Sequence, residues 1–502
     1  MFAHSRATHH ASLMIDQHSP RRSWSASNSK STATLGVMTT LLALTTSATH
    51  GDGDARGHLH EFRTNNALRD GDGDEALWMA QARSFIGYDA MSGTEPLFGG
   101  THQSKSFDWS EARLSPQGHA GAVGMFQSPM QPVINPVRNA LHAARDVVGL
   151  RSDIYEAISF SAVSDTLENT RTSAAAARFN ARADLLLFRN VGEGIGVFTA
   201  QVRQNNRWPA QGANLSASVG SPSDINELES GVDTKLARLQ YSQSVLDDRM
   251  KFTIGKLNPN DYIAMNIFAS DEVTQFLAQP FDGNDVLPMG FQNYTEGVAL
   301  QSLLTDWLYF DGVFASAAGG NDAMIEIDFA SGFAAMAEIG VLLDLERAGI
   351  KGQSLRISAA WAGANTNSTL VSQNASPDIW GNALAFTAQY FVRPEVGLWA
   401  QAAVAEEDVA STATSQIAVG LTFDNCFGRV GDGFGVAMSW TDPLDVPGGA
   451  PLGHEGLFET FYRMQVTGTS QLSLDAQLLL PAADSRIDDA TIVGTVRWVF
   501  RF

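Results

Sequence analysis

The end of the chain alternates between apolar and polar positions over a dozen residues. Residues 491–502 read T-I-V-G-T-V-R-W-V-F-R-F, which would set Trp498 and Phe500 on one side of an extended strand and Arg497 and Arg501 on the other. This period of two predicts a single strand with one apolar and one polar surface. A strand of this kind that ends on an aromatic residue is typical of a membrane β-barrel, whose outer face meets lipid and whose inner face meets water.

The same alternation recurs through most of the chain. In 471–480 one face carries Leu472, Leu474, Ala476, Leu478 and Leu480, and the other carries Gln471, Ser473, Asp475 and Gln477. The segment 458–466 alternates in the same way. From about residue 151 onward, alternating runs of roughly ten residues are separated by Gly, Asn, Asp and Pro. Roughly 350 residues at roughly 22 per strand and half-turn predict an all-β fold, a transmembrane antiparallel barrel of about sixteen strands. A soluble β-sandwich also alternates and remains an alternative.

A helical membrane protein is excluded by the lack of long apolar runs. No stretch of about 18 apolar residues is present, which is the length that a spanning helix needs. The segment 333–345 comes closest, but Glu338 interrupts it.

Composition narrows the possible functions. The net charge is −21, and such a surface repels phosphates, so we expect no nucleic-acid partner. Cys426 is the only cysteine, which excludes an internal disulfide and a cysteine-based metal cluster. We expect neither a metal nor another cofactor.

The first 150 residues divide into three parts. Residues 1–48 end in a short apolar run and the small residues T-S-A, which predicts a secretory signal peptide cut near Ala48. Residues 49–125 are rich in Gly, Asp and His without a period and are interpreted as an acidic, disordered extension. Residues 126–150 form a short helical lead-in to a barrel at 151–502.

Adjacent carboxylates give no support to catalysis. Glu406-Glu407 and Asp247-Asp248 are neighbours in sequence, and neighbours on a strand point to opposite faces, so they cannot flank one substrate. We predict that the protein is not an enzyme.

Four segments resemble one known family. They are the hairpin-like 236–257 with its D-D-R turn, 305–315 opening on T-D-W, 427–439 with F-G-R-V-G-D-G, and 459–467 reading E-T-F-Y-R-M-Q-V-T. In this order they are similar to the OprB-type carbohydrate-selective porin family, over roughly residues 135–502.

The resemblance implies passive diffusion of mono- and oligosaccharides through a barrel in the bacterial outer membrane. The expected partners are sugars as solutes, outer-membrane lipid, and the barrel-assembly machinery acting on the terminal Phe502. A non-selective diffusion porin and a structural or adhesive barrel remain alternatives, and a soluble glycan-binding β-sandwich is a third.

Strand parity gives candidate side chains for each face. The candidates for the pore lining are Arg238, Gln240, Glu459, Arg463, Gln465, Asp475, Arg497 and Arg501. Among these, Glu459 and Arg463 are the leading candidates for a constriction, because an inward ion pair would narrow and polarise a pore. Each could equally be a solvated wall residue. The aromatic residues expected to face lipid are Tyr241, Phe252, Tyr462, Trp498 and Phe500.

Overall fold

A computed structural model describes most of the chain from residue 148 onward. It covers residues 148–501 except 168–169, 191–193, 210–213, 230, 247–248, 289–293, 306, 317–331, 346–352, 367–379, 394, 430, 445–451 and 481–489, and before them only Pro136 and Ala140. The predicted signal peptide, the extension, nearly all of the lead-in and Phe502 lie outside these residues.

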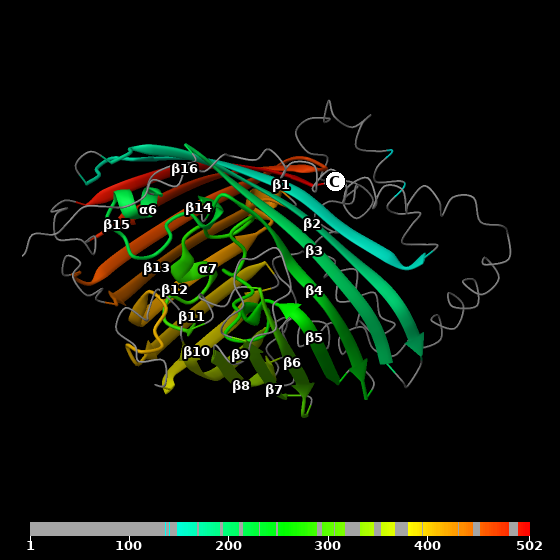
Figure 1. Ribbon diagram of the computed structural model, residues 1–502. Coiled ribbons are helices and arrows are strands. Elements are labelled where there is room, and N and C mark those ends of the chain that lie inside the picture. Colours follow the sequence, from blue (N-terminus) through cyan, green and yellow to red (C-terminus); the bar gives the residue numbers. More distant parts are fainter. Residues whose placement is uncertain are drawn as a thin grey trace, which may run out of the picture. The chain divides into compact units, whose positions relative to one another are not determined.

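Sixteen antiparallel strands form one closed barrel, which confirms the predicted fold class (Figure 1). Each strand pairs with its neighbours in sequence, and β1 pairs with β16 in a register that sets Tyr155 beside Arg501. Because the barrel is closed, no sheet edge is left unpaired. Unpaired backbone groups at such an edge would be costly in the membrane interior. The strands are β1 (Leu150–Val163), β2 (Ser173–Asn190), β3 (Gly194–Trp208), β4 (Asp233–Val245), β5 (Met250–Leu257), β6 (Thr295–Leu303), β7 (Leu308–Ser316), β8 (Gly332–Asp344), β9 (Ser354–Thr366), β10 (Trp380–Arg393), β11 (Val396–Ala405), β12 (Ala413–Asp424), β13 (Gly433–Pro443), β14 (Glu455–Thr467), β15 (Ser470–Leu479) and β16 (Thr491–Arg501).

Side-chain burial follows the predicted period of two. On β16 the outward Trp498 is 42% exposed, whereas the inward Arg497 is fully buried. Trp498 and Phe500 stack at 5.3 Å on the outer face, as side chains of an interfacial aromatic girdle would. The apolar segment that Glu338 interrupts is strand β8, and Glu338 points inward. No helix in the described part of the chain is long and apolar enough to cross a membrane.

Two long connections fold into the barrel between the strands (Figure 1). The first interior segment, residues 214–229 between β3 and β4, contains α6 (Leu215–Ser218) and η2 (Glu227–Glu229). The second interior segment, residues 258–288 between β5 and β6, contains η3 (Pro259–Asp261) and α7 (Gln279–Asp282). A further short helix, η6 (Cys426–Gly428), lies in the turn between β12 and β13.

The main apolar core lies inside the barrel, between the second interior segment and one wall. The Phe276 ring meets Phe461 of β14 at 5.0 Å and Trp399 of β11 at 5.9 Å, and Phe281 meets Trp399 at 6.1 Å. Aromatic pairs at these separations add to the stabilisation that comes from burying their area. The segment is therefore packed against β11–β14 and does not hang free in the lumen.

Gly255 of β5 occupies a position that only glycine fits. Its φ is +131°, and an added Cβ would lie 2.3 Å from the carbonyl oxygen of Leu239. We expect Gly255→Ala to lower the free energy of unfolding by at least about 1–3 kcal/mol, measured by urea titration in lipid vesicles. Gly494→Ala is the matched control, since a Cβ there meets nothing within 4 Å. Equal free energies for the two variants would contradict this expectation.

Candidate functional site

All eight residues predicted to point inward do so, and each is less than 9% exposed. They lie on two parts of the wall. Arg238 and Gln240 belong to β4, whereas the other six belong to β14, β15 and β16. The two groups have different partners.

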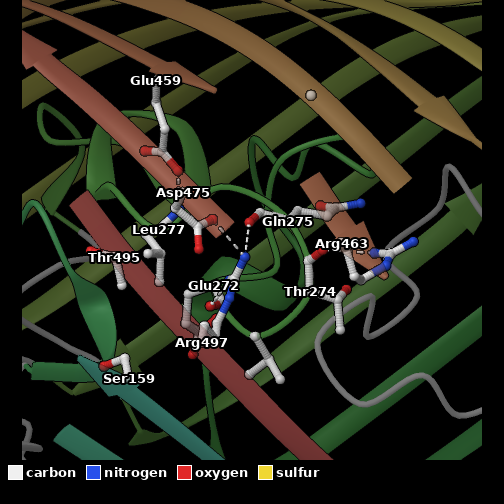
Figure 2. A network of polar contacts seen from close by, with 12 residues as sticks. Ser159, Glu272, Thr274, Gln275, Leu277, Glu459, Arg463, Asp475, Thr495 and Arg497 are labelled. Carbon is white, nitrogen blue, oxygen red and sulfur yellow. Dashed lines mark hydrogen bonds and ion pairs between the residues drawn. The ribbon is translucent and has the colours of Figure 1, made fainter. Parts of the chain in front are cut away.

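The β15–β16 wall holds the backbone of the second interior segment at its carbonyl groups. Arg497 donates to the carbonyl oxygens of Glu272 at 2.5 Å and Gln275 at 2.7 Å, and it pairs with Asp475 at 2.9 Å (Figure 2). A guanidinium presents several donors in a fixed plane, so one arginine can hold two carbonyl groups and a carboxylate together.

Two residues of β14 also bind the backbone of this segment. Arg463 donates to the carbonyl oxygen of Thr274 at 2.7 Å. Glu459 accepts the backbone N–H groups of Leu277 at 2.7 Å and Ala278 at 3.1 Å. The wall therefore binds both polarities of the backbone over residues 272–278.

The other end of the same segment is held by β8, β9 and β10. Arg356 of β9 donates to the carbonyl oxygen of Met265 at 2.6 Å and forms an ion pair with Glu338 of β8. Glu338 also accepts the backbone N–H of Ala264 at 2.6 Å, and Gln389 of β10 donates to Met265 at 2.9 Å.

These two anchorages make the segment cross the barrel. In the closed order of strands, β8 and β9 lie opposite β16 and β1. The seven steps from Met265 to Glu272 can span at most roughly 23–25 Å, and a long arginine side chain extends the reach at each end. Residues 264–278 are called the crossing segment below.

The part of the lumen on the β11–β14 side of the crossing segment is filled. The aromatic core occupies it, and α7 is fixed there by Gln401 and Gln416, which donate to the carbonyl oxygen of Pro280 at 2.7 and 2.6 Å. Inward residues of this wall include apolar side chains, such as Ala418 and Ala437, beside polar ones that hold the segment.

The wall formed by β2–β5 has the opposite character. Most of its buried residues are polar, and three of its cations surround one aromatic ring: Arg203, Lys235 and Arg238 lie 5.3, 5.2 and 5.9 Å from the centre of Tyr294. Arg238 also holds both carboxylate oxygens of Asp261 in η3. Polar side chains persist at such positions where they are paired or meet water.

The two interior segments meet along a seam. The N–H of Glu227 donates to the carbonyl oxygen of Leu277 at 3.0 Å, and the N–H of Gln279 donates to that of Asp224 at 2.8 Å. Ser223 donates to the Asp285 carboxylate at 2.7 Å. The seam consists of residues 223–229 and 277–285.

Carboxyl groups of the seam have raised pKa values. Burial, followed by the neighbouring Asp224, raises the pKa of Glu227 to about 8. Burial raises the pKa of Asp285 to about 6, although hydrogen bonds from Ser223 and Thr412 oppose the rise. Burial and Glu227 also raise the pKa of Asp282, and the cations Arg178 and Arg203 of the facing wall act against this. The seam thus brings several buried acids together, and burial outweighs the effect of the cations on the facing wall.

The seam should loosen as the pH rises. Each of these acids has a higher pKa when folded than its unfolded value of ~4, so its contribution to seam stability is complete below ~4 and is lost as the pH rises through about 6 and about 8. We expect protection of the Glu227 and Gln279 amides from hydrogen exchange, corrected for intrinsic rates, to fall by about tenfold or more between pH 5 and pH 9. Glu227→Gln should flatten this dependence, and a fall of equal size in that variant would contradict the expectation.

The predicted ion pair between Glu459 and Arg463 is wrong. Arg463 pairs with Asp424 at 3.3 Å, and Glu459 bonds to backbone N–H groups and to Gln477. Residues four apart on one strand face are separated by roughly 13 Å along the strand, which is too far for a direct pair. That the eight residues line a pore stays a prediction.

Sequence reasoning missed Arg356, Glu338 and Gln389. Their inward position follows from the same parity, and Glu338 was visible as a charge within an apolar run. Nothing in the local pattern indicates that their partners are backbone groups of residues 264–267.

The comparisons with known proteins agree with this architecture. A family model described as carbohydrate-selective porin, OprB family, matches residues 168–502. The chain is similar to the high-pH structure of Pseudomonas putida OprB, with a TM-score of 0.57 and 13% identity, covering 70% of this chain and 94% of that one. A triple mutant of Rhodopseudomonas blastica porin matches with a TM-score of 0.42 and 12% identity, covering 70% of this chain and 100% of that one. At 13% identity, the likeness to the P. putida protein concerns the fold alone. No curated protein matches the chain in sequence.

Proposed function

Because the chain belongs to the OprB family of carbohydrate-selective porins, we propose that sugars cross its barrel between the crossing segment and the polar β2–β5 wall. The protein is a passive, carbohydrate-selective channel of the bacterial outer membrane. Its family and fold point to a channel and not to an enzyme.

One observation carries the proposed route: the two sides of the crossing segment differ in polarity. The β11–β14 side is packed with Phe276, Phe281, Trp399 and Phe461, so solutes have no room there. The β2–β5 side presents amides, hydroxyls and cations. These groups can replace the hydrogen bonds that a sugar gives up to water, while each contact stays weak enough for release.

The eight candidate residues then fall into two roles. Gln240 of β4 borders the route and contacts solutes, whereas Arg238 beside it holds Asp261 of the second interior segment. The other wall residues act on solutes indirectly, because they hold the crossing segment in place. Glu459, Arg463 and Arg497 bind its backbone, and Asp475 pairs with Arg497. The remaining two, Gln465 and Arg501, lie near the short turn between β14 and β15, on the periplasmic side if the short turns face the periplasm as in other barrels.

Targeting completes the proposal. Cleavage near Ala48 would release the chain after export, and the C-terminal Phe502 would be recognised by the barrel-assembly machinery. Alternating faces such as that of β16 support insertion as a barrel.

Liposome swelling tests the function. The full chain, isolated from outer membranes and reconstituted, should admit monosaccharides faster than amino acids of matched size. Equal rates would favour a non-selective porin. No entry, in protein whose insertion is verified by heat-modifiable gel mobility, would favour a structural or adhesive barrel.

A further inference from the structure

Glu459 has more partners in the interior segments than a wall residue needs. It is fully buried on the inner face of β14, and its carboxyl group accepts from three donors: the N–H groups of Leu277 and Ala278, and Nε2 of Gln477 at 3.0 Å. Two consecutive backbone N–H groups bound by one carboxyl fix both the position and the direction of the chain that carries them.

Gln477 of β15 links this point to the first interior segment. It lies directly across from Glu459 in the strand pairing, and its Nε2 also donates to the carbonyl oxygen of Ile225 at 2.8 Å. The pair thus holds Ile225 of the first segment and Leu277 of the second. The seam bond from Glu227 to Leu277 joins the two segments next to the same point.

The number of wall residues that bind the carbonyl groups of the crossing segment differs from the number that bind its N–H groups. Three carbonyl groups are bound by two arginines, Arg463 and Arg497, so the loss of one arginine leaves the other in place. Among the described residues at this wall, the N–H groups of Leu277 and Ala278 rely on Glu459 alone. This makes Glu459 the least replaceable anchor.

We propose that Glu459, supported by Gln477, is a positioning residue that sets the largest solute the channel admits. It contacts no solute. It acts by holding both interior segments toward the β14–β15 wall at one shared point. Because Arg178 of β2 also pairs with Glu272, this point sets the width of the opening beside that ion pair, between the crossing segment and the β2–β5 wall. The inference rests on the proposed route, and it adds the residue that determines the width of that route.

Two substitutions at Glu459 distinguish the effect of losing its hydrogen bonds to the crossing segment from the effect of losing its charge. Glu459→Ala removes every acceptor, so both N–H groups lose their partner and the segments can move. Glu459→Gln keeps the size and one acceptor oxygen but turns a donor toward backbone donors, so it should have an intermediate effect. Gln471→Ala is the matched control: Gln471 is also inward and buried on β15, and its side chain donates to Gln465 of the wall at 2.8 Å.

The readout is the size limit of single channels in planar bilayers, found by adding neutral polymers of graded size and recording which of them lower the conductance. We expect Glu459→Ala to raise conductance by at least about 1.5-fold and to admit larger polymers than the native protein, with Glu459→Gln between them and Gln471→Ala unchanged. Normal heat-modifiable mobility verifies the barrel in each variant. If Glu459→Ala does not insert, the Gln variant decides.

An unchanged size limit in both Glu459 variants would overturn the proposal, as would an equal rise in the Gln471 control. Failure of the proposed function has a different signature. In that case the native protein would not favour sugars over amino acids in liposome swelling, whatever the polymer measurements give.

Discussion

Replacing Arg356 with methionine should destabilise the barrel by about 3–5 kcal/mol, the cost of breaking a buried ion pair from one side. Arg356 is 1% exposed and donates to Glu338, to the Tyr309 hydroxyl at 2.7 Å and to the carbonyl oxygen of Met265 at 2.6 Å. Methionine keeps much of the volume and removes every donor. Glu338 would be left buried without its cation, and the crossing segment would lose its anchor on β9.

The measurement is the free energy of unfolding from urea titration in lipid vesicles, followed by tryptophan fluorescence. Arg429→Met is the control, because Arg429 is 37% exposed and pairs with Asp432 in a turn, where an ion pair contributes at most about 1 kcal/mol. A loss in Arg356→Met no larger than in the control would contradict the assigned role of this network.

Deleting residues 259–293 should have the largest effect on transport. Leu257 and Thr295 are paired across β5 and β6, so a short turn can join the two strands without altering the barrel register. The variant loses the whole crossing segment and the core that fills the β11–β14 side. We expect single-channel conductance to rise several-fold and the preference for sugars over amino acids to disappear, because the route would no longer be bounded on both sides.

Heat-modifiable mobility serves as the control for barrel closure in the deletion variant. A closed variant with native conductance would mean that the crossing segment does not limit the route. A closed variant with higher conductance and native sugar preference would assign selectivity to the β2–β5 wall alone.

The barrel itself follows from the sequence because its determinants are local. An alternation such as that of β16 predicts which side chains face lipid, and the number of such runs predicts the number of strands. The outward aromatic positions Tyr241, Phe252, Tyr462, Trp498 and Phe500 follow from the same period, and each is partly or largely exposed in the barrel.

The interior segments could not be derived in this way, because they have no period and their contacts join residues far apart in the chain. Glu459 and Leu277 are 182 positions apart. Parity assigned Glu459, Arg463 and Arg497 to the lumen, but an inward charge can face either water or a backbone group. Only the folded path of residues 264–278 shows whether such a charge faces water or a backbone group. That path shows that these three side chains, which were expected to contact solutes, bind the crossing segment.

The route of the solute is the central claim, and a pair of cysteine substitutions tests it most directly. Ser242 of β4 and Ser439 of β13 both point inward and are 6% and 4% exposed, but they lie on the polar and the filled sides of the crossing segment. In a Cys426→Ser background, each would be replaced by cysteine and treated with a charged thiol reagent during single-channel recording. We predict that the reagent lowers the current through Ser242→Cys channels and leaves Ser439→Cys channels unchanged. Block at Ser439→Cys with none at Ser242→Cys would contradict the account.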